Sequence, residues 1–360
     1  MSRFFMEKEI FETGFVFEKI VSKYIVENNI DFGFEIANNI KKLIFIASGS
    51  SFNGCQIAGK YLKDNLNLDN QCYFSSEFLL SKPTITEDEN VLYVFASQSG
   101  ETTDTLNALK YVNQYTSKTF AFVNNDNSSI YNLAKYNINT LAGAEKSIAS
   151  TKALCAQIFC LILFGHKLKT EFIPKLFEIP NTIKIFLANY QEEKSNIKSE
   201  IEKLSSILKD ASSFVFLGSQ NDLNISNEAS LKLSETSYIN AIAFPFGEFL
   251  HGHFAILNKK VPVLAITSQF FKDFELECLN RIKKSYPNAL IINIANQNNV
   301  YDMADYKLIY YDCDNEICKI FIKLIIIQLF ALKISTDLKH DVDNPNGLTK
   351  IVKWKNDLNF

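Results

Sequence analysis

Three charged side chains share one face of an expected helix in the second half of the chain. Glu228, Lys232 and Glu235 follow one another at i, i+4 and i+7 in a stretch of otherwise uncharged residues. An exposed Glu-Lys pair, contributing a few tenths of a kcal/mol, is the alternative interpretation. Because the helix pattern contains no other charge, we expect these groups to face a cleft and not open solvent. Carboxylates in a cleft can transfer protons.

A loop with two histidines follows this helix. The segment FPFGEFLHGHFAIL places Glu248, His251 and His253 on a glycine-flanked loop, and the chain contains only four histidines. Loop histidines near a carboxylate can transfer protons at neutral pH. A solvated loop with incidental histidines, or a His-x-His metal pair, are the alternatives. No second cluster at ligand spacing accompanies the pair, so we expect neither a metal nor a cofactor.

Two serine-rich turns in the first half follow apolar strand patterns and precede helix patterns. They are Ser48-Gly49-Ser50-Ser51 and Ser97-Gln98-Ser99-Gly100-Glu101-Thr102. Backbone N–H groups at such a helix start favour an anion, and glycine lets the backbone approach it closely. The hydroxyls could instead only cap the helices. The second-half counterpart SQFFKD has neither the repeated hydroxyls nor the glycine, which favours a phosphate site in the first half.

The elements that position these residues occur twice. Gly49 and Gly218 correspond at a separation of about 170 residues, and the following strand-helix units keep that offset. Alternating apolar strands and amphipathic helices predict an α/β fold with two tandem, duplicated, doubly wound parallel-sheet lobes. The expected segments are an N-terminal helical arm (1–38), a first lobe (39–169), connecting helices (170–210), a second lobe (211–335) and a C-terminal tail (336–360).

The composition is that of a soluble globular protein that binds a small ligand. The 360 residues are 47% hydrophobic and 21% charged, with a net charge of -3, so neither nucleic acid nor an anionic membrane is expected as a partner. No signal peptide or spanning segment is apparent, which predicts a cytoplasmic location. Seven scattered cysteines predict reduced, mostly buried thiols.

The first-half motifs resemble those of the sugar-isomerase (SIS) family. SQSGET after a strand, with GSS in the preceding unit, looks like the signature with which that family holds the phosphate of a phosphosugar. AGAEKSIASTKALCAQ, residues 142–157, is similar to the family's AGxExxVASTKxxxxQ. The resemblance implies phosphate and sugar contacts from Gly49, Ser50, Ser51, Ser97, Gln98, Ser99, Thr102, Glu145, Ile148 and Ser150.

The second-half motif resembles the isomerase half of glucosamine-6-phosphate synthase. EASLKLSETSYINAIAFPFGEFLHG is similar to EGALKLKExSYIxAExxxxGELKHGP. The resemblance implies that Glu235 moves a proton between C1 and C2, with Lys232 as its partner and Glu228 in support. It also implies that His251 opens the sugar ring from a neighbouring subunit, hence a homodimer. Leu250 and His253 replace a lysine and a proline of that pattern.

The C-terminal segment contains a lysine in a turn-rich context. For an arbitrary chain it would be a flexible terminus. DVDNPNGLTKIV, however, resembles the synthase ending DxDxPRNLAKSVT, which lies over the active site. The resemblance implies that Lys350, with Thr349 beside it, forms a Schiff base with an open-chain ketose, because a neutral amine attacks a carbonyl and the iminium withdraws electrons.

Several reactions suit this set of residues. The chain enters the helical arm at once, without a glutaminase domain, so we expect a stand-alone enzyme that converts glucosamine 6-phosphate to fructose 6-phosphate and ammonia. A fructosamine-6-phosphate deglycase and a tagatose-6-phosphate-type isomerase are alternatives. A phosphosugar-binding regulator is a fourth possibility, but it does not need Glu235, His251 and Lys350 together, so their joint presence favours an enzyme.

Overall fold

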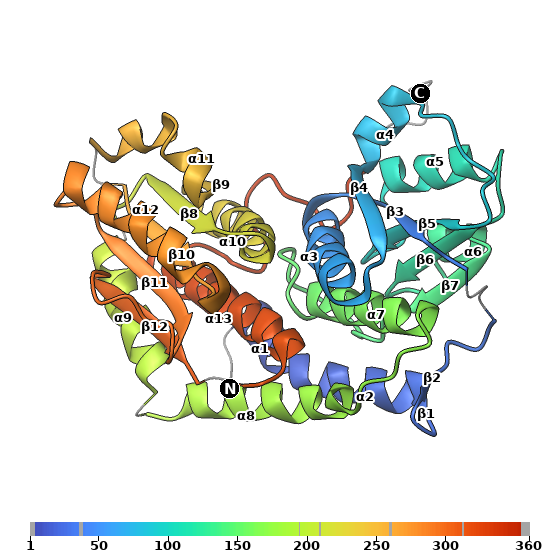
Figure 1. Ribbon diagram of the computed structural model, residues 1–360, viewed down its shortest axis with the longest axis horizontal. Coiled ribbons are helices and arrows are strands. Elements are labelled where there is room, and N and C mark those ends of the chain that lie inside the picture. Colours follow the sequence, from blue (N-terminus) through green and yellow to red (C-terminus); the bar gives the residue numbers. More distant parts are fainter. Residues whose placement is uncertain are drawn as a thin grey trace. The chain divides into compact units, whose positions relative to one another are not determined.

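The computed structural model describes residues 4–35, 39–193, 195–208, 210–258, 261–311 and 313–353 (Figure 1). The chain divides into two compact units, each built around one sheet. We name them the first-sheet unit (Glu12–Glu145, Ser150–Asn181 and Thr349–Phe360) and the second-sheet unit (Met1–Phe11, Lys146–Ala149 and Thr182–Leu348).

The first-sheet unit contains five parallel strands in the order β4-β3-β5-β6-β7. The strands are β3 (Lys42–Ala47), β4 (Asp69–Phe74), β5 (Val91–Ser97), β6 (Thr119–Val123) and β7 (Tyr136–Asn139). After β3 the chain adds β4 on one side and then crosses to add β5 on the other. The carboxyl ends of β3 and β5 therefore form the point where the strand order reverses, which is where such sheets bind ligands.

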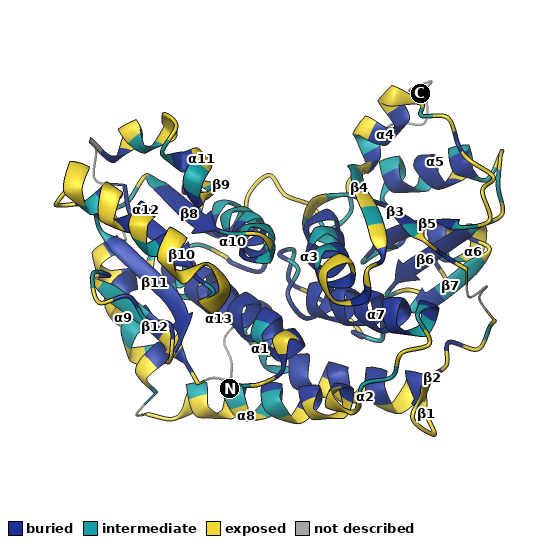
Figure 2. Ribbon diagram, viewed as in Figure 1, coloured by how far each residue is buried: buried dark blue, intermediate teal, exposed yellow. Residues whose placement is uncertain are grey.

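Helices cover both faces of this sheet. They are α3 (Gly49–Leu66), α4 (Ser75–Ser81), α5 (Thr103–Val112), α6 (Ser129–Leu133) and α7 (Lys152–Leu168). Ala121 and Val123 of β6 pack with α4, α5 and α6, whereas Phe120 and Phe122 contact Phe164 of α7. Because α7 also packs against α3, it is buried almost throughout (Figure 2).

The second-sheet unit repeats this strand order, with β12-β11-β10-β8-β9 all parallel. Its strands are β8 (Ser213–Gly218), β9 (Asn240–Pro245), β10 (Val263–Ile266), β11 (Ile291–Asn296) and β12 (Tyr306–Tyr310). Val215 of β8 packs with α11 (Phe246–Phe249) and α12 (Lys272–Ser285), and Phe214 contacts Phe330 of α13 (Glu316–Asp337). Two parallel five-stranded sheets with helices on both faces confirm the predicted α/β fold.

The remaining elements surround the two sheets. In the second-sheet unit they are α1 (Phe5–Phe11), α9 (Asn196–Leu208), α10 (Asn221–Ser237), η2 (His253–Asn258) and η3 (Gln269–Phe271). In the first-sheet unit they are α2 (Thr13–Tyr24), β1 (Ile25–Val26), β2 (Asn29–Ile30) and η1 (Pro174–Glu178). Helix α8 (Ile179–Gln191) contains the boundary between the units.

Carboxylates join distant parts of the chain within the second-sheet unit. Asp343 accepts hydrogen bonds from the backbone N–H groups of Phe5 and Met6, both at 2.8 Å, at the start of α1. Glu9 of α1 accepts from the N–H groups of Lys146 and Ser147. A carboxylate is favourable at a helix N-terminus because unpaired N–H groups and the helix dipole meet there.

The seven cysteines are free, five of them buried and two half-buried. Within the described ranges, no helix has the combination of length and apolar character needed to cross a membrane.

Candidate active site

Both serine-rich turns lie at the point where the strand order of the first sheet reverses. Ala47 of β3 is paired in register with Ala96 of β5, so the turns that follow the two strands are neighbours. Ser48 to Ser51 lead into and begin α3, and Ser97 to Thr102 lead into α5. In doubly wound sheets, ligands bind beyond the carboxyl ends of the strands at the point where the strand order reverses.

The turn after β5 is held in one conformation by its own hydroxyls. Ser97 Oγ accepts from the N–H of Gly100 and Ser99 Oγ accepts from the N–H of Glu101, each at 3.1 Å. Gly100 has a φ of 68°, and a Cβ built there would lie 2.0 Å from Ser128 Oγ. Only glycine therefore fits this position.

The same turn is also attached to the turn that follows β6. Glu101 accepts from the N–H of Ser129 at 2.7 Å and from its hydroxyl at 2.9 Å. Gly100 O accepts from the N–H of Ile130 at 3.0 Å. These contacts fix the backbone before any ligand arrives, which lowers the entropy cost of binding.

The helix-cap alternative fails for the two residues that directly precede the helices. Ser48 and Thr102 occupy the N-cap positions of α3 and α5, yet neither side chain makes a capping hydrogen bond. Ser48 Oγ instead donates to Asp104 Oδ2 at 3.1 Å, and Thr102 Oγ1 lies 3.4 Å from Ser97 Oγ. Ser51 is used differently again, because its hydroxyl lies 2.9 Å from Gln157 Oε1 of α7.

Glu145 organises the start of α7 and holds Lys350 of the C-terminal segment. Its carboxylate accepts from the N–H groups of Thr151 and Ala153 at 2.9 and 3.0 Å, and from Ser150 Oγ at 3.1 Å. Lys350 Nζ lies 2.6 Å from Glu145 Oε2, with the carboxylate fully buried and the lysine side chain 25% exposed. The structure thus brings Lys350 of the C-terminal motif together with Glu145 and Ser150 of the motif at residues 142–157.

The C-terminal segment also contacts the start of α5. Val352 O accepts from the N–H of Thr103 at 3.4 Å, and Thr103 directly follows the Ser97 to Thr102 turn. Thr349 is exposed, and its hydroxyl donates to Ile351 O at 3.0 Å. Ile148 lies in the second-sheet unit, where its N–H donates to Asp343 O at 2.9 Å.

The charged residues of α10 form a buried cluster in the second-sheet unit. Lys232 Nζ lies 3.1 Å from Glu228 Oε1 and 2.5 Å from Glu235 Oε1. Lys232 and Glu228 have fully buried side chains and that of Glu235 is 16% exposed, so the exposed-pair interpretation is wrong. Helix α10 begins at Asn221 and contains one more charge, Asp222, so the expectation of no other charge in this helix is wrong; Asp222 pairs with Lys323 at 2.6 Å.

The electrostatics of this cluster keep the lysine charged. Burial by itself lowers the pKa of Lys232, but the carboxylates of Glu228 and Glu235 more than offset this effect and raise the pKa. Lys232 is therefore an ammonium that can stabilise negative charge. Glu235 has an ionic partner and is the more exposed of the two carboxylates, which are the properties of a positioned general base.

The histidine loop is largely exposed. His251 is exposed in the turn after α11, whereas Glu248 is exposed within that helix and not on a loop as expected. The ring of His253 packs against Phe244, with 4.2 Å between the ring centroids. In the part of the chain that the structure describes, no group of three or more His, Cys, Asp or Glu side chains is placed to hold a metal ion.

Gln157 and Glu275 are two buried polar residues that the sequence analysis did not single out. Gln157 is the last residue of the AGAEKSIASTKALCAQ motif, so its position in the motif was the available signal. Glu275 of α12 is fully buried and accepts from the N–H of Ser268 and the hydroxyl of Tyr301, both at 3.1 Å. It occurs in the exposed-looking run KDFELE, in which no pattern indicates burial.

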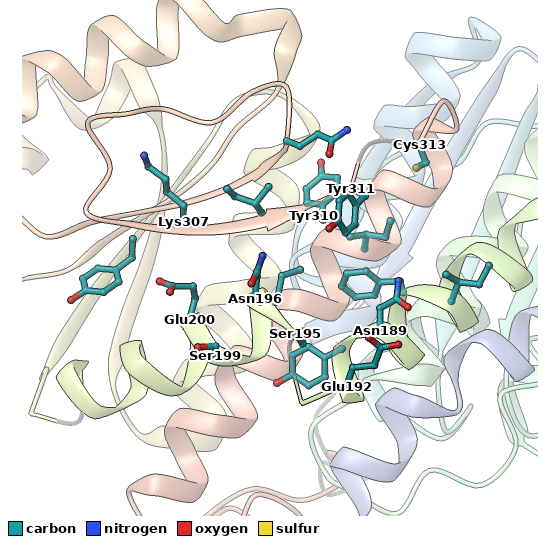
Figure 3. Close-up of a pocket in the computed structure, with 18 of the residues that line it drawn as sticks. Asn189, Glu192, Ser195, Asn196, Ser199, Glu200, Lys307, Tyr310, Tyr311 and Cys313 are labelled. Carbon is teal, nitrogen blue, oxygen red and sulfur yellow. The ribbon is translucent and has the colours of Figure 1, made fainter.

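A separate pocket of about 870 Å³ lies in the second-sheet unit along edge strand β12 and helices α8 and α9 (Figure 3). Tyr310 and Tyr311 line it together with Asn189, Asn196 and Glu200. None of the site residues indicated by the motifs is among the residues that line it.

Comparison with known proteins agrees with the motifs and the fold. Residues 37–167 match the SIS domain family. The isomerizing glutamine–fructose-6-phosphate aminotransferases of Campylobacter jejuni and Fusobacterium nucleatum are 31% and 29% identical to this chain. Each match covers 97% of this chain but 58% of the relative, so the chain spans little more than half the length of these curated proteins.

Solved structures show the same architecture. The C-terminal domain of glucosamine-fructose-6-phosphate aminotransferase from Francisella tularensis is 25% identical, with a TM-score of 0.82 over 96% of this chain and 99% of that one. A glucosamine-6-phosphate deaminase from Thermotoga maritima shares the fold, with a TM-score of 0.74, 18% identity, and coverage of 97% of this chain and 99% of that one. The chain therefore contains a SIS domain and is homologous, over nearly its whole length, to the isomerase domain of glucosamine-fructose-6-phosphate aminotransferases.

Proposed function

We propose that this protein is a phosphosugar aldose-ketose isomerase and deaminase that converts glucosamine 6-phosphate and water to fructose 6-phosphate and ammonia. One observation carries the proposal. The segment that contains Lys350 is attached to the rest of the first-sheet unit at two places, by Lys350 to Glu145 and by Val352 to Thr103. An amine is thereby held in the unit whose Ser97 to Thr102 turn offers hydroxyl and N–H donors to an anion.

The phosphate would bind at the carboxyl ends of β3 and β5. A dianion requires donors, and the hydroxyls of Ser50, Ser99 and Thr102 with the adjacent N–H groups can supply them without a cationic side chain. The fixed turn conformation supports this assignment, because its donors need little reorganisation when the ligand arrives. Gly49, Ser51, Ser97, Gln98 and Ser150 would complete the contacts to the phosphate and the sugar.

Proton transfer would be the task of the α10 cluster. After His251 has helped to open the ring, Glu235 takes the proton from C2 and returns it to C1, while the Lys232 ammonium stabilises the charge that develops. A second proton passes from the C2 amine to the C1 oxygen, which becomes a hydroxyl. The product is an imine at C2. Lys350, having passed a proton to Glu145, displaces ammonia from that imine, and water then hydrolyses the lysine imine to the ketose.

A homodimer is part of the proposal. His251 is exposed in this chain, which is the state expected of a residue that acts in a neighbouring subunit. The test is complementation: mixing inactive His251→Ala and Glu235→Gln proteins, after partial unfolding and reassembly, should restore activity. Activity that stays absent in a verified mixed dimer would exclude a shared site.

The direct test is to incubate the purified protein with glucosamine 6-phosphate and to measure both ammonia and fructose 6-phosphate. We expect equal amounts of the two products, and none from unphosphorylated glucosamine. Isomerisation without ammonia would favour the tagatose-6-phosphate-type alternative. Release of an amino acid from a fructosamine 6-phosphate would favour the deglycase, for which Leu250 in place of lysine is the supporting residue. Binding without turnover of any of these sugars would favour a regulator.

A further inference from the structure

Gln157 is a polar side chain in an otherwise apolar stretch of α7. It is 1% exposed, and the residues from Ala153 to Phe164 are apolar apart from this one. Helices α3 and α7 approach closely here, as the distance at Gly54 shows. A Cβ built on this glycine would lie 2.8 Å from Leu154 Cδ1. The close approach lets Gln157 reach Ser51 at the start of α3, with 2.9 Å between Ser51 Oγ and Gln157 Oε1.

The amide of Gln157 has two orientations with different consequences. With Oε1 toward Ser51, the Nε2 group is buried and has no hydrogen-bond partner among the described residues. The oxygen and nitrogen of an amide have nearly the same shape, so the hydrogen-bond network decides between the orientations. A buried N–H group without a partner is rarer in proteins than an under-satisfied carbonyl. Rotating the amide by half a turn puts Nε2 beside Ser51 Oγ and gives the amide nitrogen an acceptor.

The orientation decides what Ser51 can offer a ligand. A serine hydroxyl has one hydrogen, so a Ser51 that donates to Gln157 can only accept from a ligand. A phosphate dianion has acceptors alone. Once Gln157 Nε2 donates to Ser51 Oγ, the hydrogen of Ser51 is free to point toward the phosphate.

We propose that Gln157 is a positioning residue whose amide donates to Ser51 and thereby fixes Ser51 as a hydrogen-bond donor to the phosphate of the substrate. The inference rests on the proposed function and adds a residue that acts through Ser51 without touching the sugar. It also restricts the residue type, because only a side chain that donates at this position leaves the Ser51 hydrogen available.

The test compares two variants of nearly unchanged shape. In Gln157→Glu an ionised carboxylate can only accept, so it captures the Ser51 hydrogen and places a negative charge near the phosphate. A protonated carboxyl can still donate. We expect the Kd for fructose 6-phosphate at pH 8 to rise at least tenfold relative to wild type, and this ratio to fall as the pH is lowered.

Gln157→Met keeps the volume, cannot donate and is at most a weak acceptor. We expect it to raise KM for the phosphosugar several-fold with kcat unchanged, and to change Kd by less than twofold when Ser51→Ala is already present, because the effect passes through Ser51. Thermal unfolding of each variant verifies that it is folded. Gln157→Glu binding as wild type does at pH 8, or Gln157→Met weakening binding equally with and without Ser51, would overturn the inference.

Wild-type protein separates this inference from the function on which it rests. Wild type that does not bind fructose 6-phosphate contradicts both. Wild type that binds, together with variants that fail the comparisons above, contradicts the role of Gln157 alone.

Discussion

Lys350 and Glu145 are 205 positions apart in the sequence, and their Nζ and Oε2 atoms lie 2.6 Å apart within the first-sheet unit. The carboxylate is fully buried and also binds the first N–H groups of α7. A buried carboxylate with this many donors has a fixed position, so the lysine amine is fixed as well.

The first prediction concerns this lysine. Lys350→Ala should abolish the adduct that borohydride traps with fructose 6-phosphate, because the imine-forming amine is gone. Mass spectrometry of the intact protein measures the adduct. Lys353→Ala is the matched control, since Lys353 is an exposed lysine of the same segment, and it should leave trapping unchanged. Undiminished trapping in Lys350→Ala would reject the assignment.

The second prediction concerns the turn after β5. Ser99→Ala combined with Thr102→Ala should weaken binding of fructose 6-phosphate at least tenfold, because hydrogen bonds to a charged group contribute about 1.5–3 kcal/mol each. Isothermal titration calorimetry measures the affinity. Ser206→Ala removes an exposed hydroxyl on α9 that bonds only its own helix, and should have no effect. Equal affinities of the double variant and wild type would contradict the phosphate assignment.

The third prediction separates stability from catalysis in the α10 cluster. Lys232→Met should lower the free energy of unfolding by about 3–5 kcal/mol, because the buried carboxylate of Glu228 loses its ammonium partner. Urea denaturation measures the loss. Glu235→Gln, at the partly exposed carboxylate, should cost far less stability but reduce kcat by about 10²- to 10⁴-fold, as expected for loss of a general base. The reverse pattern would show that Glu235 is structural.

The fourth prediction concerns Glu275. Burial raises its pKa to about 7, an effect that Asp222 reinforces and that the Ser268 N–H, Ser219 and Tyr301 hydroxyls partly oppose. Between about pH 4.5 and pH 7, the folded state therefore holds a proton on Glu275 that the unfolded state, with a pKa near the ordinary 4.5, has released. Its stabilising contribution is complete below about pH 4.5 and is lost as the pH rises toward 7.

Glu275→Gln removes that proton equilibrium. The variant should gain stability relative to wild type between pH 5 and pH 8, by an amount on the order of 3 kcal/mol. Denaturant unfolding at several pH values measures the difference. Glu277→Gln, an exposed carboxyl two residues further along α12, is the control and should show no such trend. A difference between Glu275→Gln and wild type that does not change with pH would contradict the raised pKa.

The local patterns of the sequence determined the fold and most of the candidate residues. Alternating apolar strands and amphipathic helices specify two parallel sheets, because side chains buried on both faces leave a continuous apolar signal. The Ser97 to Thr102 turn was recognisable because its residues are consecutive. The spacing of Glu228, Lys232 and Glu235 placed them on one helical face, since helical periodicity is a local property.

Only the tertiary structure decided how buried these groups are and what they contact. The sequence could not distinguish an exposed Glu-Lys pair from the buried Lys232 cluster, because the burial of the α10 side chains depends on elements far along the chain that pack against this helix. The partnership of Gln157 with Ser51 depends on the close approach of α3 and α7. The burial of Glu275 depends on the packing of α12 against its sheet. Contacts between distant segments follow from packing, and local patterns do not record them.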